Sequence, residues 1–226
     1  MYTIKVKDTD LSVSTSMEEG FKNYLLRQRT FLNDPVNVDT LDQRINDWVN
    51  LSWNGVKTTY SNLDENSQIM DIGSGLGIVD ILAYQMVKGG KFHLLDSTGG
   101  YPGPHYYSED YRFYNNWIVT ENIIKSTNCN KDDFIFVDPL DKWTTEFDLI
   151  TSYSAWCWHF PFQKYWDRVK AHLKLGGKLV VDISKFGMVH SPDSTVLSEI
   201  SETFGSYPKI QRLSDLGNRY TWIRQT

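Results

Sequence analysis

The sequence has little of what several classes of protein require. Its 226 residues include 2 cysteines, Cys129 and Cys157, which are too few for a disulfide framework or a zinc cluster. No apolar run approaches the roughly 18–20 residues that a membrane-spanning helix needs. Residues 1–7 alternate as in a β-strand and lack the apolar block of a signal peptide. We therefore expect a cytoplasmic protein with no membrane partner and no metal site.

Positive charge is also scarce. The chain has 23 Lys and Arg residues against 28 Asp and Glu residues, a formal net charge of −5. Proteins that bind nucleic acid usually carry a basic face that neutralises phosphates. Here Lys22, Arg27 and Arg29 form at most a small basic patch. We therefore do not expect a nucleic-acid partner.

The order of the predicted segments is that of an α/β protein. After a strand at 68–72 and a helix that ends near residue 87, strands and crossover helices alternate, which predicts an open, mostly parallel sheet. The further strands are expected at 91–96, 133–138, 147–152, 178–183, 209–213 and 219–223, and the further helices at 111–127, 162–173 and 194–204. The last two strands flank a hairpin-like turn.

The N-terminal part does not follow this alternation. Residues 17–31 and 41–51 carry apolar side chains at helical spacing. We interpret residues 1–60 as a helical cap and not as an independent domain, because so short a segment buries too small a core to fold alone. We expect residues 61–226 to form the main domain and the whole chain to be a single globular unit.

The most informative segment is the glycine-rich stretch at 69–77, Ile-Met-Asp-Ile-Gly-Ser-Gly-Leu-Gly. Alternating glycines allow positive φ and let a ligand approach the main chain closely. The helix that follows offers unpaired N–H groups that suit an anion. A nucleotide-like cofactor is therefore expected across this turn. A dinucleotide fingerprint would need a third glycine where Ile78 stands, which makes an NAD-dependent reductase the weakest alternative.

Several motifs together resemble those of the class I S-adenosylmethionine-dependent methyltransferases. The pattern D-x-G-x-G-x-G from Asp71 to Gly77 is similar to motif I of that family, and residues 147–152 are similar to its fourth-strand motif. Residues 173–181 are similar to its L-K-P-G-G-x-L-V motif, with Leu175 in place of proline. The resemblance spans about residues 65–185. It implies a Rossmann-like seven-stranded open sheet, mostly parallel with a C-terminal antiparallel hairpin, beside the N-terminal helical cap.

The resemblance also implies which residues bind S-adenosyl-L-methionine. In doubly wound sheets ligands bind beyond the carboxyl ends of the strands, where several of these residues fall. Asp96, 25 positions after Asp71, is expected to accept hydrogen bonds from both ribose hydroxyls. The expected cofactor-binding residues are Asp71, Gly73, Ser74, Gly75 and Gly77 at the turn, Asp96 at the ribose, Asp138 and Leu140 at the adenine, and in addition Ser97 and Ser152. Structural alternatives remain: Asp71 could cap the turn, Asp96 could be a solvated loop acid, and Asp138 could initiate a turn with Pro139.

The acceptor side is marked by two aromatic clusters, at 99–107 and 153–160. Both follow strand ends, where aromatic rings can stack on planar groups or face a sulfonium cation. The alternative is that they pack in the core. We expect His105, Tyr153 and Trp156 to bind the substrate, and the segment rich in proline and glycine at 99–107 to act as a lid. If the acceptor is a hydroxyl, His159 is the expected catalytic base, since imidazole titrates near neutrality. A structural role for this histidine is the alternative.

These features predict methyl transfer to a small molecule, for example to a hydroxyl on a sugar or aromatic compound. Nucleic-acid amino-methyltransferases carry Asp or Asn followed by Pro-Pro-aromatic after the fourth strand, whereas Ser152-Tyr153-Ser154-Ala155 stands here. A protein or RNA acceptor remains an alternative, as does a catalytically silent cofactor-binding or interaction protein. The sequence predicts neither the identity of the acceptor nor the oligomeric state.

Overall fold

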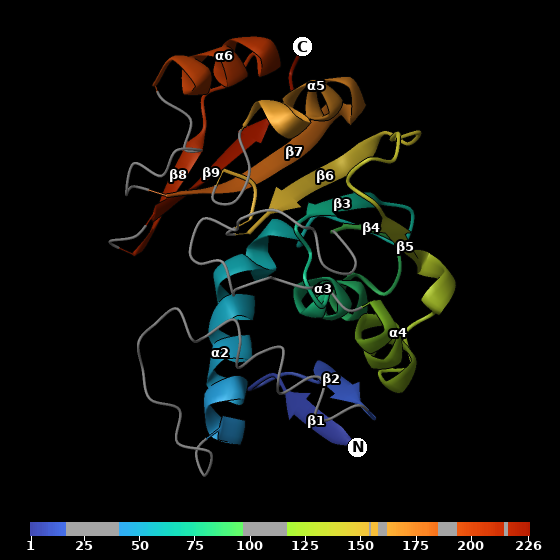
Figure 1. Cartoon of the computed structure of the whole chain (residues 1–226). Helices are drawn as coiled ribbons and strands as arrows, with labels where there is room; N and C mark the ends of the chain where they lie inside the picture. The colour runs from blue at the N-terminus through green and yellow to red at the C-terminus, as the bar shows by residue number, and fades with distance from the viewer. Residues whose placement is uncertain (17–40, 97–116, 154, 158–161, 185–193, 215–216) are drawn as a thin grey trace, which may run out of the picture. The chain divides into compact units, whose positions relative to one another are not determined.

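The computed structural model describes residues 1–16, 41–96, 117–153, 155–157, 162–184, 194–214 and 217–226 (Figure 1). The chain forms two compact units. The first comprises residues 1–65, 75–89 and 97–134, and the second comprises residues 66–74, 90–96 and 135–226.

The second unit is organised around a seven-stranded sheet of order β5-β4-β3-β6-β7-β9-β8 (Figure 1). Strands β3, β4, β6 and β7 pair in parallel, whereas β9 is antiparallel to both β7 and β8. This confirms the predicted mostly parallel sheet that ends in an antiparallel hairpin. The strands are β3 Gln68–Ile72, β4 Lys91–Leu95, β5 Phe134–Val137, β6 Phe147–Ser152, β7 Leu173–Ser184, β8 Lys209–Ser214 and β9 Gly217–Ile223.

One face of this sheet carries the apolar core of the second unit. Because successive side chains of a strand point to opposite faces, alternate residues of β3 and of the second half of β7 enter this core. Helices α5 (Gln163–His172) and α6 (Ser194–Phe204) supply the other side of it. The buried core residues include Met70, Ile72, Ile150, Leu179 and Val181 from the strands, and Tyr165, Trp166, Val169, Ile200 and Phe204 from the two helices.

The strand β7 begins earlier than the sequence predicts. We expected a turn at 175–177 and a strand from residue 178, but β7 already pairs with β6 at Leu173. An irregularity between Phe147 and Leu149 shifts the register, so the two strands stay paired past the glycines. Gly176 takes φ +78° and its N–H donates to the Arg224 carbonyl over 2.7 Å. The strand therefore continues through the two glycines instead of ending at them.

The first unit contains a small antiparallel pair of strands and three described helices. Strand β1 (Tyr2–Lys5) pairs with β2 (Ser12–Thr15), and β2 contacts α3 (Ile78–Val87) and α4 (Trp117–Ser126). Gln85 of α3 forms two hydrogen bonds with the Ser12 main chain, of 3.0 and 2.7 Å. Single 3₁₀ turns occupy Lys57–Thr59 and Lys131–Asp133. The strand at the N-terminus was predicted, but β2 was not.

One of the two helices predicted in the N-terminal part lies within the described residues. Helix α2 (Leu41–Val56) starts where the sequence predicts and is longer by five residues. Ile45, Val49, Trp53 and Val56 are buried at a helical spacing, which carries the pattern past the expected end at residue 51. The helix expected at 17–31, and residues 111–116 of the helix expected at 111–127, lie outside the described residues.

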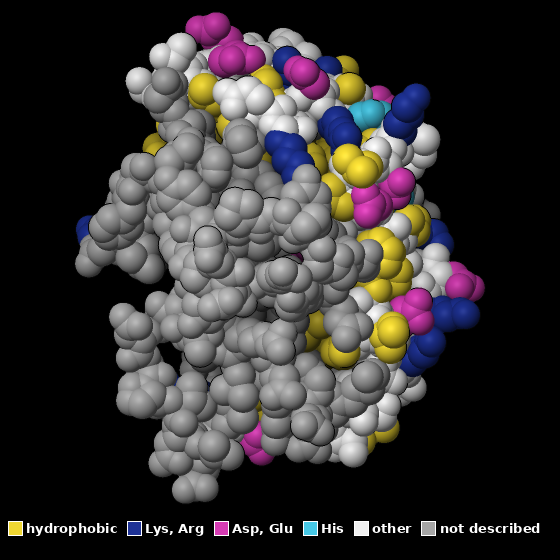
Figure 2. All heavy atoms as spheres, viewed as in Figure 1, with side chains coloured by type: hydrophobic (Ala, Val, Ile, Leu, Met, Phe, Trp, Pro, Cys, Tyr) yellow, Lys and Arg dark blue, Asp and Glu magenta, His cyan; other side chains and the backbone are white. Residues whose placement is uncertain are grey.

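Figure 2 shows the side chains on one face of the molecule. On the face that Figure 2 shows, described Lys and Arg side chains are interspersed with Asp and Glu side chains. In the described part of the chain, no helix combines the length and the apolar character needed to cross a membrane.

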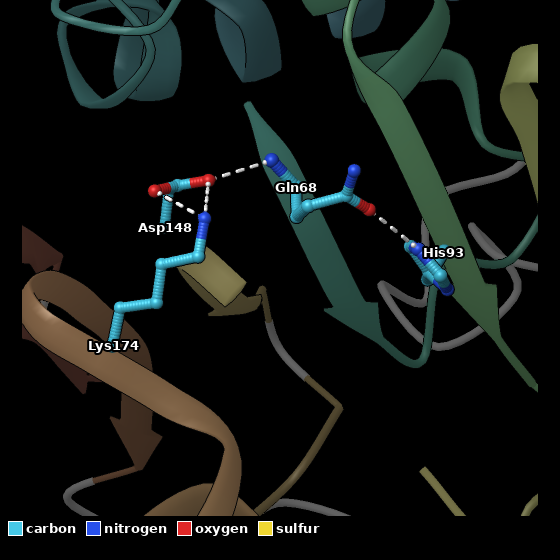
Figure 3. Close-up of polar contacts among 4 residues, drawn as sticks. All are labelled: Gln68, His93, Asp148 and Lys174. Atoms are coloured by element: carbon cyan, nitrogen blue, oxygen red, sulfur yellow. Dashed lines mark hydrogen bonds and ion pairs between the residues drawn. The ribbon is translucent and has the colours of Figure 1, made fainter. Parts of the chain in front are cut away.

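A polar cluster joins four strands near the amino ends of β3, β6 and β7 (Figure 3). The Gln68 N–H donates to Asp148 Oδ2 over 2.8 Å, and Lys174 Nζ donates to both Asp148 oxygens, over 2.9 and 2.8 Å. The side-chain oxygen of Gln68 lies 3.1 Å from His93 Nε2 on β4. These contacts favour one register for the parallel strands, since a slip by one residue would separate the partners.

Candidate active site

The glycine-rich turn leaves the carboxyl end of β3. Gly73, Gly75 and Gly77 all have positive φ, at +82°, +57° and +64°, a region that L-residues with a side chain adopt at a cost. Gly73 and Ser74 both donate their N–H groups to the Leu95 carbonyl, over 2.7 and 3.3 Å. The three glycines are therefore required by the path of the backbone itself.

Gly73 has a second structural reason to be glycine. A Cβ added there would collide with the Cβ of Ala155, which follows β6. Beside it, the hydroxyl of Ser74 is buried and has no hydrogen-bond partner among the described residues. A buried hydroxyl without a partner is costly, which is typical of a group that a ligand engages.

Helix α3 begins directly after this turn. Gly77 occupies the N-cap position and, lacking a side chain, offers no cap hydrogen bond to the first N–H groups of the helix. The Ile81 N–H donates to the Gly77 carbonyl over 2.9 Å, which is the first bond of the helical ladder. The predicted strand, turn and helix are therefore all present in this order.

Asp71 lies in β3 with a buried side chain, 4% exposed. Its Oδ1 accepts a hydrogen bond of 2.8 Å from Thr151 Oγ1 on the neighbouring strand β6. The carboxylate therefore has a structural partner within the sheet. Its role toward the cofactor stays a prediction.

Asp96 follows β4 directly and is partly exposed. Its N–H donates to the Val137 carbonyl of β5 over 3.3 Å, which places the residue at the carboxyl ends of these two strands. This is the edge at which ligands bind in open α/β sheets. Its predicted bonds to the ribose stay a prediction, and Ser97 lies outside the described residues.

Asp138 follows β5 and begins a tight turn, as the structural alternative for this residue expected. Its Oδ1 accepts from the Leu140 N–H over 2.9 Å, and its carbonyl accepts from the Asp141 N–H over 2.9 Å. Pro139 occupies the second position of the turn, where its fixed φ is favourable. The turn exposes the Leu140 side chain, 84% of which is accessible. Contact of Asp138 and Leu140 with adenine stays a prediction.

Ser152 and Trp156 have structural partners within the second unit. The Ser152 hydroxyl donates to the Ile72 carbonyl and accepts from the Trp156 N–H, both over 2.8 Å. The Trp156 ring is fully buried, stacks on Phe162 with centroids 5.0 Å apart, and donates its indole N–H to the Phe162 carbonyl. Packing in the core is thus what the structure describes for Trp156. Its contact with substrate, like that of Ser152 with cofactor, stays a prediction.

Tyr153 extends from the end of β6 and is half-buried. The guanidinium of Arg219 lies over its ring, with Cζ 4.6 Å from the ring centroid. Arg219 in turn forms a two-pronged ion pair with Asp182, over 2.6 and 2.8 Å. Neither Arg219 nor Asp182 was predicted from the sequence, although the acid within the apolar run Leu-Val-Val-Asp-Ile of residues 179–183 was a signal for Asp182.

Cys157 lies close to the predicted site but is unsuited to nucleophilic chemistry. The thiol is fully buried, and this burial raises the pKa of Cys157 far above its usual range. Cys129 and Cys157 are both free thiols. The two predicted histidines, His105 and His159, lie outside the described residues, so the candidate catalytic base stays a prediction.

The order of the sheet, with its antiparallel last pair and its glycine-rich turn after β3, defines the fold of the class I S-adenosylmethionine-dependent methyltransferases. No protein-family model matches the sequence, and no curated protein matches it either. Solved structures are similar to it only at low sequence identity, so the likeness concerns the fold.

Three of these structures illustrate the similarity. The S-adenosylmethionine-dependent methyltransferase SibL in its apo form has a TM-score of 0.56 and 12% identity, over 90% of this chain and 69% of that chain. Magnesium protoporphyrin IX methyltransferase from Synechocystis PCC 6803, with bound SAM, has a TM-score of 0.51 and 12% identity, over 93% and 98%. A methyltransferase from Pyrococcus furiosus has a TM-score of 0.50 and 13% identity, over 92% and 100%.

Proposed function

We propose that the protein is an S-adenosylmethionine-dependent methyltransferase that acts on a small molecule, for example on a hydroxyl of a sugar or aromatic compound. The observation that carries this proposal is the glycine-rich turn after β3, in which the three glycines have positive φ and the buried Ser74 hydroxyl has no partner among the described residues. The SAM-bound structure with the same fold supports the choice of cofactor.

The described residues fit the proposed cofactor at separate points. The turn offers main-chain N–H groups and the Ser74 hydroxyl, which suit the carboxylate of the methionine moiety. Asp96 stands at the carboxyl end of β4, where a carboxylate can accept from two vicinal hydroxyls. Leu140 is exposed beside the Asp138 turn, and an apolar side chain of this kind can pack against a purine ring.

When bound, S-adenosylmethionine supplies an electrophilic methyl group. The work of the chain is to hold the acceptor in line with that group, which is the main source of rate enhancement in such a displacement. A hydroxyl acceptor also has to lose its proton, and we propose His159 for this step, with His105 and Tyr153 binding the acceptor. A neutral amine acceptor would need only positioning.

We propose a cytoplasmic location. The two free cysteines agree with a reducing compartment. The mixture of charges on the described surface in Figure 2 gives no support to an RNA acceptor.

Calorimetry of the purified protein tests the proposal. S-adenosylmethionine and S-adenosylhomocysteine should both bind, and Asp96→Asn should weaken both affinities by about 10- to 100-fold, because charge-assisted hydrogen bonds to the ribose are lost. Asp47→Asn, an exposed acid of α2, is the matched control and should bind like the wild type. Absence of binding to the wild-type protein would overturn the proposal, and equal affinities of wild type and Asp96→Asn would remove Asp96 from the site.

A further inference from the structure

Ser152, the last residue of β6, joins two segments of chain that meet at the carboxyl end of β3. Its fully buried hydroxyl donates to the Ile72 carbonyl and accepts from the Trp156 N–H, both over 2.8 Å. Ile72 directly precedes the glycine-rich turn, and Trp156 belongs to residues 155–157, the described segment after β6. One hydroxyl therefore connects the start of the turn with this segment.

The 155–157 segment packs against the glycine-rich turn. Ala155 lies so close to Gly73 that a Cβ added to the glycine would collide with the Ala155 Cβ. The turn is also bonded to β4, on the other side of β3, because Gly73 and Ser74 both donate their N–H groups to the Leu95 carbonyl. The turn is therefore held between β4 and the 155–157 segment.

The backbone of this segment is strained at Cys157. This buried residue has φ +66°, a region that a residue with a side chain adopts at a cost, and such conformations persist only where surrounding contacts enforce them. Trp156 makes contacts of this kind. Its ring stacks on Phe162, its indole N–H donates to the Phe162 carbonyl, and its main-chain N–H donates to Ser152. A strained segment that is held this firmly is typical of a pre-organised functional site.

The part of the turn that is fixed in this way is the part proposed to bind the methionine moiety. The N–H groups of Gly73 and Ser74 are already bonded to β4, so the buried Ser74 hydroxyl, which has no partner among the described residues, is the donor that these two residues offer a ligand. A hydrogen bond weakens steeply with distance and angle, so a small shift of the turn would lose it. Asp96, proposed for the ribose, is held by another strand, since its N–H donates to the Val137 carbonyl of β5.

We propose that Ser152 is a positioning residue, which fixes the glycine-rich turn in the conformation that binds the methionine moiety of the cofactor. It does so by holding Ile72 on one side and Trp156 on the other. The inference rests on the proposed function and adds to it a residue that serves the cofactor through the main chain that it holds. Loss of the Ser152 hydroxyl should therefore weaken binding of the amino-acid end of the ligand and spare the nucleoside end.

The test compares two ligands that share the nucleoside, S-adenosylhomocysteine and 5′-methylthioadenosine, which lacks the amino-acid group. Calorimetry measures both affinities for the full chain. Ser152→Ala should lower the affinity for S-adenosylhomocysteine by about tenfold and keep that for 5′-methylthioadenosine within about twofold, because only the first ligand engages the part of the turn that Ser152 positions.

Ser201→Ala is the matched control. The Ser201 hydroxyl accepts from Trp222 Nε1 over 3.1 Å and donates to the Leu197 carbonyl over 3.0 Å, so it makes the same kind of bridge between a tryptophan N–H and a carbonyl. This bridge joins α6 to β9 and does not involve the glycine-rich turn. Ser201→Ala should keep the wild-type ratio of the two affinities. An equal shift of the ratio in Ser201→Ala would overturn the positioning role, since it would reflect a general loss of stability.

The outcomes separate this inference from the proposed function. If the wild-type protein binds neither ligand, the proposed function fails. If it binds both and Ser152→Ala keeps the wild-type ratio, the positioning role is wrong and the proposed function stands. Should Ser152→Ala fail to fold, Ala155→Gly decides, because it removes the side chain that packs on Gly73 and leaves Ser152 in place. A selective loss of S-adenosylhomocysteine affinity in Ala155→Gly supports the inference, and an unchanged ratio overturns it.

Discussion

Gly73 combines two constraints in one residue. Its φ of +82° disfavours any side chain, and its Cα approaches Ala155 so closely that an added Cβ collides with the Ala155 Cβ. From the sequence, this glycine was expected for its freedom to adopt positive φ and for the close approach of a ligand. The structure adds a reason within the fold, since the chain after β6 has to pass directly over the turn.

We predict that Gly73→Ala lowers the free energy of unfolding by about 2–4 kcal/mol, through the collision and the unfavourable φ together. Urea denaturation measures the loss. Ala155→Gly removes the colliding atom, so the double variant should recover more than half of the loss, leaving mainly the cost of the positive φ, about 1 kcal/mol. Additive losses in the double variant would show that Ala155 is not the obstacle.

For the candidate site residues, the position along the chain could be predicted from the sequence, but the hydrogen-bond partners could not. Asp71, Asp96 and Asp138 were predicted because each lies at or near the end of a predicted strand, and the structure places them in or directly after β3, β4 and β5. Their role toward a cofactor stays a prediction. The bonds of Asp71 to Thr151 and of Ser152 to Ile72 were not foreseen, because they depend on cross-strand geometry. Arg219 was missed for the same reason: its partner Asp182 is 37 positions away.

At the scale of helices and strands, a strong apolar pattern was sufficient to predict where an element begins and ends, whereas a weak pattern was not. β3, β6 and α6 have the bounds that the sequence predicts. β2 was missed because four residues, Ser-Val-Ser-Thr, carry too short a pattern to stand out. The early start of β7 was missed because paired glycines usually end an element, and only the long-range pairing with β6 overrides that preference.

The stability of the paired strands β3 and β4 depends on pH through His93. Its ring is buried against Phe147, with centroids 5.0 Å apart, and contacts Gln68. Burial, and secondarily the charge of Lys91, lowers the pKa of His93 to about 4 from its usual 6.5. The folded state therefore holds this ring neutral over a range in which the unfolded chain takes up a proton.

We predict that this histidine destabilises the fold in mild acid. The pKa of His93 is lower in the folded state than in the unfolded state, so the unfolded chain takes up the proton first as the pH falls. The free energy of unfolding is therefore unaffected by this residue above about pH 6.5, and it decreases by up to about 3 kcal/mol as the pH drops toward 4. Denaturant titrations at pH 4.5, 5.5 and 7 in wild type and His93→Gln measure the effect. The difference in unfolding free energy between the two proteins should shift in favour of His93→Gln as the pH falls. A difference that stays constant with pH would contradict the assignment to His93.

For the whole molecule, the sheet order could be predicted only through resemblance to a family. Local patterns predict strands and helices, but the order β5-β4-β3-β6-β7-β9-β8 follows from pairings between distant segments. The bounds of the two compact units could likewise not be predicted from local apolar patterns, because each unit is assembled from three separate stretches of chain. The prediction of the acceptor-binding residues has the least support from the sequence. An aromatic side chain can line a pocket or pack in the core, and the sequence pattern of the two clusters does not distinguish these roles.

The stability of the whole molecule reports which cofactor class it binds. A ligand that binds only the folded state stabilises it by about 2.7 kcal/mol at 100 times its Kd, which for a chain of this length raises Tm by about 5–10 °C. We predict this rise with S-adenosylhomocysteine and none with NAD at equal concentration, because Ile78 stands where a dinucleotide fingerprint needs glycine. Thermal scans of wild type and Asp96→Asn provide the measurement. In Asp96→Asn the same rise should require about 10- to 100-fold more ligand, in step with its weakened affinity. A rise with NAD alone would reverse the assignment, since the turn after β3 would then hold a dinucleotide.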